Sequence, residues 1–225
     1  MTVLVRRGVQ VLAKAAVQVV VLFVSAGTVR WPAGWLYVGL YVGVVAVGAA
    51  VLVPGHRDVV EERSRGRQGA VAWDRHLTRA LTVAWLGILV VAGLAQRWGW
   101  LPQLPPWLVA VGVAVFLLGS GIMLWAMAAN PFFAQVVRIQ TDRGHTAVAE
   151  GPYRFVRHPG YTGMCLSTLG SALLLGSPWA LLPWAGCVAL LVLRTSLEDQ
   201  TLAGELDGYR EYRTRTRYRL VPRIW

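Results

Sequence analysis

The sequence predicts an all-α fold: a polytopic bundle of membrane-spanning helices followed by a cytoplasmic C-terminal helix and tail. Hydrophobic residues make up 56% of the 225 residues, and the mean hydropathy is +0.50, which is too apolar for an ordinary soluble domain. The apolar residues also gather into runs close to the roughly 20 residues that a bilayer core requires. We therefore expect about five to six spans, of which the last two form a shorter helical hairpin.

The first four spans are single apolar runs. They cover residues 9–29, 34–53, 80–96 and 106–129. The first run follows Arg6 and Arg7, and "SAG" at its end could pass for the cleavage site of a signal peptide. Its apolar core is too long for a signal peptide and further apolar runs follow, which favours an uncleaved first helix. Lys14 and Gln18 lie one turn apart in this run, so they either face other helices or Lys14 extends its ammonium to the interface.

The remaining apolar region, residues 161–193, is interrupted by "GSPW" at 176–179. Pro178 cannot continue a helix that enters it, so we expect a hairpin of two shorter helices here. Cys165 and Cys187 both lie in this region, and their spacing suggests no metal site. We expect them to be small packing residues.

The basic residues predict the orientation. All but one of the 22 are Arg, and a six-span arrangement leaves only Arg30 and Arg97 in the loops of one side. The Arg-rich side is therefore expected to be cytoplasmic. The net charge of +11 then reflects topology and attraction to anionic lipids, with no nucleic-acid partner. The preference for Arg over Lys and the Ala, Val and Gly-rich helices point to a bacterial protein of the inner membrane.

The linker at residues 54–77 mixes five Arg with four acidic residues. It is predicted to be a solvated cytoplasmic loop with a short surface helix, and we assign it no chemistry. The chain also lacks a Walker loop, GxGxxG, Gly-x-Ser-x-Gly and HExxH.

A dense polar cluster, "HTAVAEGPYRFVRHPGYTG" at 145–163, lies between two apolar regions. A Gly-Pro pair within it marks a turn. His158 precedes Pro159, which suits the first turn of a helix, so the fifth span is expected to start near 159–160. Arg157 and His158 then lie at a helix N-terminus, whose free N–H groups suit the carboxylate or phosphate of a soluble cofactor. A basic loop that only fixes topology would explain the Arg residues but not the His, Tyr and ordered turns.

The second informative segment is residues 194–225. Arg194 and Glu198 lie four residues apart on one helix face, which by itself predicts only a weak ion pair. Arg194 directly follows the apolar "CVALLVL", however, and ionisable residues near membrane depth favour a function. Beyond Glu198 the pattern predicts a cytoplasmic helix, a break at Gly208 and a basic, aromatic tail.

Together, the cluster and the later pattern R-x-x-x-E-D-x-x-L…GYREY…R-x-x-P resemble the isoprenylcysteine carboxyl methyltransferase family and the related membrane phospholipid methyltransferases. The resemblance covers about residues 130–225. It implies a division into an N-terminal part, 1–129, with about four spans, and a catalytic part, 130–225, with a cofactor-binding loop, the helical hairpin and the cytoplasmic tail.

The resemblance implies that the cofactor is S-adenosyl-L-methionine and that no metal is needed. Arg194 matches an Arg near the methyl acceptor, and is the expected catalytic residue. The residues expected to bind the cofactor are His145, Thr146, Ala147, Val148, Tyr153, His158, Pro159, Gly160, Tyr161 and Glu198. Two departures leave roles open: Asp199 stands where the family has a second Glu, and either Arg138 or Gln140 takes the place of a Gln.

The expected acceptor is lipophilic: an isoprenoid-type carboxylate or thiol, or a lipid in the bilayer. A carboxylate is already an anion, whereas an amine would need a base to remove its proton, and no base stands out near Arg194. The sequence leaves two alternatives. One is a membrane NADPH-dependent enzyme similar to the sterol reductases, and the other is a non-enzymatic membrane sensor or scaffold. Nothing in the sequence predicts the oligomeric state.

Overall fold

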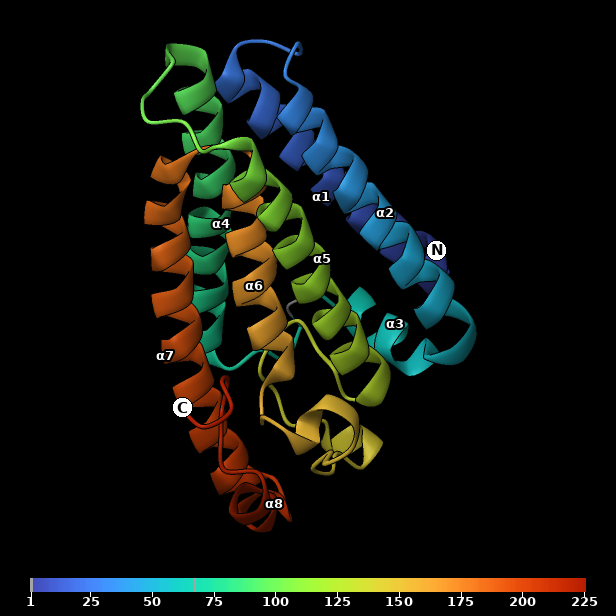
Figure 1. The fold of residues 1–225 in the computed structure, drawn as a ribbon. Coiled ribbons are helices and arrows are strands. Elements are labelled where there is room, and N and C mark those ends of the chain that lie inside the picture. The colour runs from blue at the N-terminus through green and yellow to red at the C-terminus, as the bar shows by residue number, and fades with distance from the viewer. Residues whose placement is uncertain (1, 67) are drawn as a thin grey trace.

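A computed structural model describes residues 2–66 and 68–225, so Arg67 of the linker lies outside the described residues. The described part of the chain contains helices and no strands (Figure 1), which confirms the all-α prediction. The α-helices are α1 (Val3–Ala26), α2 (Pro32–Gly55), α3 (Arg57–Ser64), α4 (Ala72–Trp98), α5 (Pro106–Ala129), α6 (Pro159–Leu174), α7 (Leu181–Glu205) and α8 (Tyr209–Arg215). Three short 3-10 helices, η1 (Thr141–Arg143), η2 (Gly151–Arg154) and η3 (Pro178–Ala180), lie in the connections.

Among the described residues, five helical segments are long and apolar enough to cross a membrane: α1, α2, α4, α5 and the segment Pro178–Glu205 that contains α7. The sixth helix of the bundle, α6, has 16 residues. The hairpin of α6 and α7 is as predicted, but only α6 is short. The helix α7 reaches 25 residues because polar residues 194–205 continue the apolar part without a break. In the same way α4 starts at Ala72 instead of 80, because two polar turns precede its apolar run.

The helices alternate in direction, so both termini, α3 and α8 lie at one end of the bundle (Figure 1). We call this the pocket end. The turns α1–α2, α4–α5 and α6–α7 lie at the opposite end. Large apolar side chains cover the outside of the bundle, such as Leu12 and Val83, which are about 70% exposed. Such a surface suits contact with lipid chains rather than with water.

The helices α5 and α6 approach each other closely because glycines lie at their contact. A Cβ atom built on Gly119 would lie 2.3 Å from the backbone nitrogen of Ser167, and one on Gly163 would lie 2.6 Å from the carbonyl oxygen of Gly119. At Gly170 the nearest atom would be the nitrogen of Phe116, at 2.3 Å. Small residues at helix contacts are the usual means of packing helices in lipid, where the burial of apolar side chains does not favour helix association.

Gln18 faces another helix, as one of the two predicted alternatives had it, whereas Lys14 is exposed and contacts the segment after α5. Gln18 is buried and accepts a 2.6 Å hydrogen bond from the hydroxyl of Tyr37 in α2. The ammonium of Lys14 donates to Oε1 of Gln135, beyond α5, at 3.0 Å. Cys187 is buried and Cys165 half-buried, and both are free thiols.

Candidate functional site

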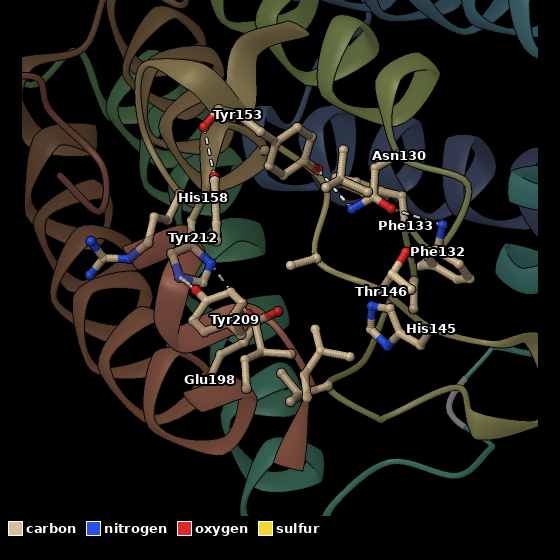
Figure 2. Close-up of a pocket in the computed structure, with 18 of the residues that line it drawn as sticks. Asn130, Phe132, Phe133, His145, Thr146, Tyr153, His158, Glu198, Tyr209 and Tyr212 are labelled. Atoms are coloured by element: carbon tan, nitrogen blue, oxygen red, sulfur yellow. Dashed lines mark hydrogen bonds and ion pairs between the residues drawn. The ribbon is translucent and has the colours of Figure 1, made fainter. Parts of the chain in front are cut away.

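A pocket opens at the pocket end, between the connection from α5 to α6, the last turns of α7, and α8. Its accessible volume is about 110 Å³. Figure 2 shows His145 and Thr146 on one side of this space, with Tyr209, Tyr212 and His158 on the other.

The structure brings together nearly all the predicted binding residues. Those that line the pocket are His145, Thr146, Ala147, Val148, Tyr153, His158, Gly160, Tyr161 and Glu198. Pro159 is buried in the first turn of α6 behind this wall, and Arg194 lies to one side. Their role in binding stays a prediction, but their convergence on one pocket is a feature of the fold.

Glycine turns and the start of α6 position the residues that line the pocket. Gly144 and Gly151 have φ values of 61° and 57°, which glycine adopts without strain, and they end η1 and begin η2. A Cβ on Gly151 would also lie 2.9 Å from that of Ala129. His158 is the N-cap and Pro159 the first residue of α6, as predicted.

One edge of the pocket is formed by Glu198, Tyr161 and His158. The Tyr161 hydroxyl donates a hydrogen bond to the Glu198 carboxylate. The His158 ring is parallel to the Tyr161 ring, with centroids 5.8 Å apart, and its Nδ1 is 3.9 Å from Glu198 Oε2. Because the Glu198 side chain keeps a fifth of its surface exposed, the carboxylate can still accept bonds from a ligand.

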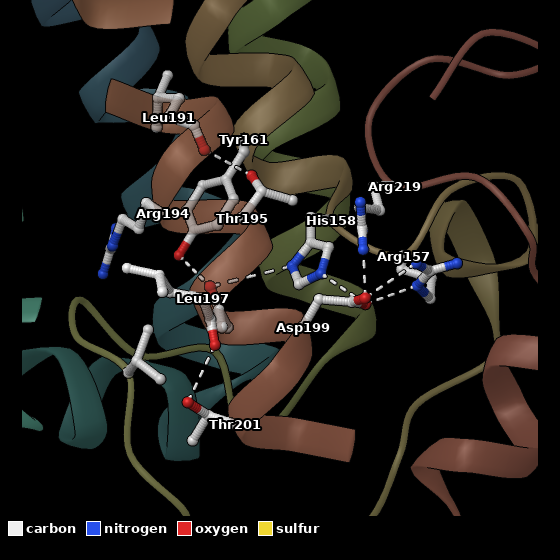
Figure 3. A network of polar contacts seen from close by, with 12 residues as sticks. Arg157, His158, Tyr161, Leu191, Arg194, Thr195, Leu197, Asp199, Thr201 and Arg219 are labelled. Carbon is white, nitrogen blue, oxygen red and sulfur yellow. Dashed lines mark hydrogen bonds and ion pairs between the residues drawn. The ribbon is translucent and has the colours of Figure 1, made fainter. Parts of the chain in front are cut away.

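Asp199, whose role the sequence left open, is the centre of a buried ionic network (Figure 3). Arg157 donates two hydrogen bonds to it, from Nε to Oδ1 at 2.7 Å and from Nη2 to Oδ2 at 3.1 Å. Arg219 donates to Oδ2 at 3.2 Å, and the Tyr209 hydroxyl donates to Oδ1 at 2.9 Å. Burial and the charge of Asp199 raise the pKa of Tyr209 well above its ordinary value, so the phenol stays a donor. The two neighbouring acids on α7 thus have different positions. Glu198 lines the pocket, whereas Asp199 connects the segments that form the pocket wall.

The C-terminal tail completes the wall. The backbone N–H of Arg157 donates to the carbonyl of Tyr218, and that of His158 donates to the carbonyl of Arg219, both at 2.9 Å. Thr162 adds a side-chain bond of 2.7 Å to the carbonyl of Leu220. This corrects the expected anion site, because the tail and Asp199 already occupy the donors of Arg157 and the His158 N–H. Gly160, which lines the pocket at the second residue of α6, keeps an N–H that has no partner within the helix.

Arg194 does not pair with Glu198 as the simplest prediction had it. It is buried and donates through Nε to Asp74 Oδ1 at 2.7 Å and through Nη2 to Oδ2 at 3.2 Å. Asp74 also accepts from the N–H of Val137, a residue of the pocket wall, at 2.8 Å. The Arg194 guanidinium lies 5.1 Å from the centre of the Tyr161 ring.

The linker, to which the sequence analysis gave no chemistry, therefore supplies two buried acids. Asp74 at the start of α4 is fully buried, and Glu62 in α3 is 3% exposed. Glu62 binds Arg138 through two bonds of 2.7 and 2.8 Å. A buried carboxylate needs such a partner to offset its desolvation. For Asp74 the available sequence signal was its position shortly before an apolar run, similar to the signal that singled out Arg194.

The alternatives Arg138 and Gln140 take different places. Arg138 lines the pocket, and its hydrogen bond with Glu62 raises the pKa of the guanidinium. Gln140 is buried and braces the loop through bonds with the Phe132 carbonyl and Arg143. Burial first, and then the charges of Arg138 and Arg143, lower the pKa of His145 to about 4. Its Nδ1 accepts from the Gln140 N–H at 3.3 Å.

Several lining residues were not predicted. Those from the end of α5 and the loop after it are Asn130, Phe132 and Phe133, and those from α7, α8 and the connection between them are Leu202, Leu206, Tyr209 and Tyr212. The Asn-Pro step at 130–131 was an available turn signal. Tyr209 and Tyr212 stood in the "GYREY" motif, which by itself gave them no position in space.

The pocket thus combines one accessible carboxylate with aromatic rings and backbone groups. Among the residues that the structure describes, no group of His, Cys, Asp and Glu could hold a metal ion. The site is suited to hold an organic cofactor that carries its own reactive group, with the protein supplying position and charge.

Residues 107–205 match the family model described as phospholipid methyltransferase. Protein-S-isoprenylcysteine O-methyltransferase B of Arabidopsis thaliana is 27% identical over 44% of this chain and 46% of that protein. The probable protein-S-isoprenylcysteine O-methyltransferase of Oryza sativa subsp. indica is 29% identical over 58% of this chain and 69% of that protein. The protein-S-isoprenylcysteine O-methyltransferase of Xenopus laevis is 33% identical over 33% of this chain and 26% of that protein. The chain thus spans about half of the Arabidopsis relative, and these matches confirm the resemblance seen in the motifs.

Proposed function

Because residues 107–205 match the phospholipid methyltransferase family model and the chain is similar to isoprenylcysteine methyltransferases, we propose that it is an integral membrane methyltransferase. In this proposal it uses S-adenosyl-L-methionine and methylates a lipophilic acceptor at the cytoplasmic face of the membrane. The observation that carries the proposal is the pocket in which the motif residues His145, Tyr153, His158 and Glu198 converge at the end of apolar helices.

The lining residues fit the proposed cofactor. Glu198 offers a partly exposed carboxylate to an ammonium or a ribose hydroxyl, and the N–H of Gly160 is available to a carboxylate. Aromatic rings such as Phe132 and Tyr209 suit adenine, and the negative face of an aromatic ring also favours a sulfonium. When bound, S-adenosyl-L-methionine supplies an electrophilic methyl group on its sulfonium sulfur.

The chain's own residues then have to hold the acceptor in line with that methyl group and keep the site dry. Tyr161 lies between the two proposed positions, since its hydroxyl binds Glu198 and its ring faces Arg194. Arg194 donates its hydrogen bonds through Nε and Nη2. Within the described part of the chain this leaves Nη1 as the edge that could orient a carboxylate acceptor.

The names of the relatives favour an acceptor of the isoprenylcysteine type, and the apolar outside of the bundle supports delivery from the bilayer. The cytoplasmic orientation rests on Arg: both termini and the Arg-rich segments lie at the pocket end, opposite Arg30 and Arg97. We assign the protein to a bacterial inner membrane on its Arg-rich composition alone.

The proposal is tested by methyl transfer from labelled S-adenosyl-L-methionine. The purified protein is incubated with a farnesylated cysteine analogue and, separately, with bacterial lipid extract, and the labelled product is identified. Label in a base-labile methyl ester supports a carboxylate acceptor. An absence of transfer to both, together with tight binding of NADPH, would contradict the proposal.

The acceptor role of Arg194 needs a variant that leaves no buried charge unpaired. Truncating Arg194 alone would leave the buried Asp74 carboxylate without a counter-charge and lower the free energy of unfolding by about 3–5 kcal/mol. The double variant Asp74→Asn with Arg194→Gln removes both charges and keeps similar shapes. We expect it to bind S-adenosylhomocysteine and to lose about 2–4 kcal/mol of transition-state stabilisation, roughly 30- to 1000-fold in rate. A double variant with normal turnover would show that the pair is structural only.

A further inference from the structure

A second cationic site lies beside the pocket, where α1, α3 and the segment after α5 meet. One face of α1 carries Arg7, Gln10 and Lys14 at helical spacing, and this face lies against α3. The last residues of α3 add Arg63. Three cations thus gather at the pocket end of apolar helices.

Two glutamines hold this arrangement in place. Gln10 accepts a bond from Nη1 of Arg7 at 3.4 Å, and its amide nitrogen donates to the carbonyl of Ser64 at 3.0 Å. Gln135 accepts from Lys14, and its amide nitrogen donates to the carbonyl of Arg63. The end of α3 is therefore fixed between α1 and the pocket wall.

Arg63 differs from three neighbouring arginines, one just after α3 and two in the loop after α5. Arg65, Arg138 and Arg143 all have carboxylate partners, drawn from Glu62, Asp142 and Asp58. Arg63 instead lies over the ring of Phe133, with 5.6 Å to its centre. Burial and the nearby charge of Arg7 lower the pKa of Arg63 to about 9, which is the direction expected of a cation that lacks a neutralising anion.

We propose that Arg63 and Arg7 bind the anionic head group, phosphate or carboxylate, of a membrane amphiphile. Both side chains are half-buried, so they remain open to a ligand on one side. They lie where the apolar helices end, at the level at which lipid head groups meet cationic side chains. A bidentate guanidinium with a second cation beside it matches the shape and charge of such a head group.

The site adjoins the main pocket through Phe133. This residue lines the pocket, and its ring would lie 2.8 Å from a Cβ atom on Gly160. The proposed anion site and the pocket therefore share Phe133 as a common wall.

Native mass spectrometry of the full chain in detergent tests this inference. The probes are phosphatidylglycerol, phosphatidylcholine with the same acyl chains, oleate and inorganic phosphate. We expect phosphatidylglycerol or oleate to bind at least tenfold more tightly than phosphatidylcholine. Arg63→Gln and Arg7→Gln should each weaken that binding roughly tenfold, the effect of one charge-assisted contact.

Arg57→Gln is the matched control, because Arg57 is an exposed arginine of the same helix. Arg63→Lys keeps the charge but loses the bidentate geometry, so it should bind more tightly than Arg63→Gln and less tightly than the wild type, which separates loss of the site from loss of the fold. Equal binding of phosphatidylglycerol to the Arg63→Gln and Arg57→Gln proteins would overturn the inference. Inorganic phosphate binding as tightly as the amphiphiles would overturn the assignment to a membrane ligand.

Discussion

In the α5–α6 pair, backbone meets backbone at glycines, whereas around Asp199 separate segments meet through charged side chains. Gly119 and Gly163 leave no room for a single methyl group between the two helices. Asp199 instead accepts hydrogen bonds from the segment before α6, from α8 and from the tail, through Arg157, Tyr209 and Arg219. The first region belongs to the apolar part of the bundle and the second to its pocket end.

The difference follows from the surroundings. In lipid, burying apolar side chains between helices gains no hydrophobic free energy. The contact between α5 and α6 is therefore stabilised by dispersion between closely approaching atoms. At the pocket end the segments are short and polar, and buried charges there need full pairing. We therefore expect the stability of the α5–α6 contact to depend on side-chain volume, and the stability of the Asp199 network to depend on side-chain charge.

The largest effect is expected from Asp199→Asn, which keeps the shape and removes the charge. Arg157 would remain buried without its counter-charge, at a cost of about 3–5 kcal/mol of unfolding free energy. Thermal unfolding in detergent measures the loss. Glu205→Gln, an exposed acid of the same helix, should change little. Equal stability of the two variants would mean that the network carries no net stabilisation.

Gly119→Ala tests the glycine contact. The added methyl would collide with the backbone of α6, and overpacking of this kind costs about 1–3 kcal/mol or more. Gly121→Ala on the same helix has open space around its Cβ atom. It should be neutral or stabilising by up to about 1 kcal/mol. If both variants unfold at the same temperature, the two helices are not held by glycine packing.

These two regions also differ in how far the sequence predicts them. Apolar runs and Pro178 predict the helices well, because length and hydropathy suffice for that. The motif residues predict most of one pocket wall. The partners of Asp199 and Arg194 were missed because Arg219 and Asp74 are 20 and 120 residues away from them. Which glycines meet across α5 and α6 depends on the rotation of each helix, which hydropathy does not fix.

A smaller effect is expected from pH at His145. Its folded pKa of about 4 lies below the ordinary value of 6.5. The unfolded chain therefore takes up this proton first as the pH falls from 7 to 4, and stability falls over that window. We expect the wild type to lose at most about 2–3 kcal/mol more than His145→Gln between these two values, since solvent screens the half-buried ring. Unfolding curves of both proteins at pH 7 and pH 4 give the difference, and parallel losses would contradict the assignment.

The central claim is that the pocket edged by Glu198 and Tyr161 binds S-adenosyl-L-methionine. Calorimetric titration with S-adenosylhomocysteine tests it most directly. The account predicts that the wild type and Glu205→Gln bind alike, whereas Glu198→Gln and Tyr161→Ala each weaken binding about tenfold or more, since each removes a contact worth at least about 1.4 kcal/mol. Unchanged affinity in both pocket variants would contradict it.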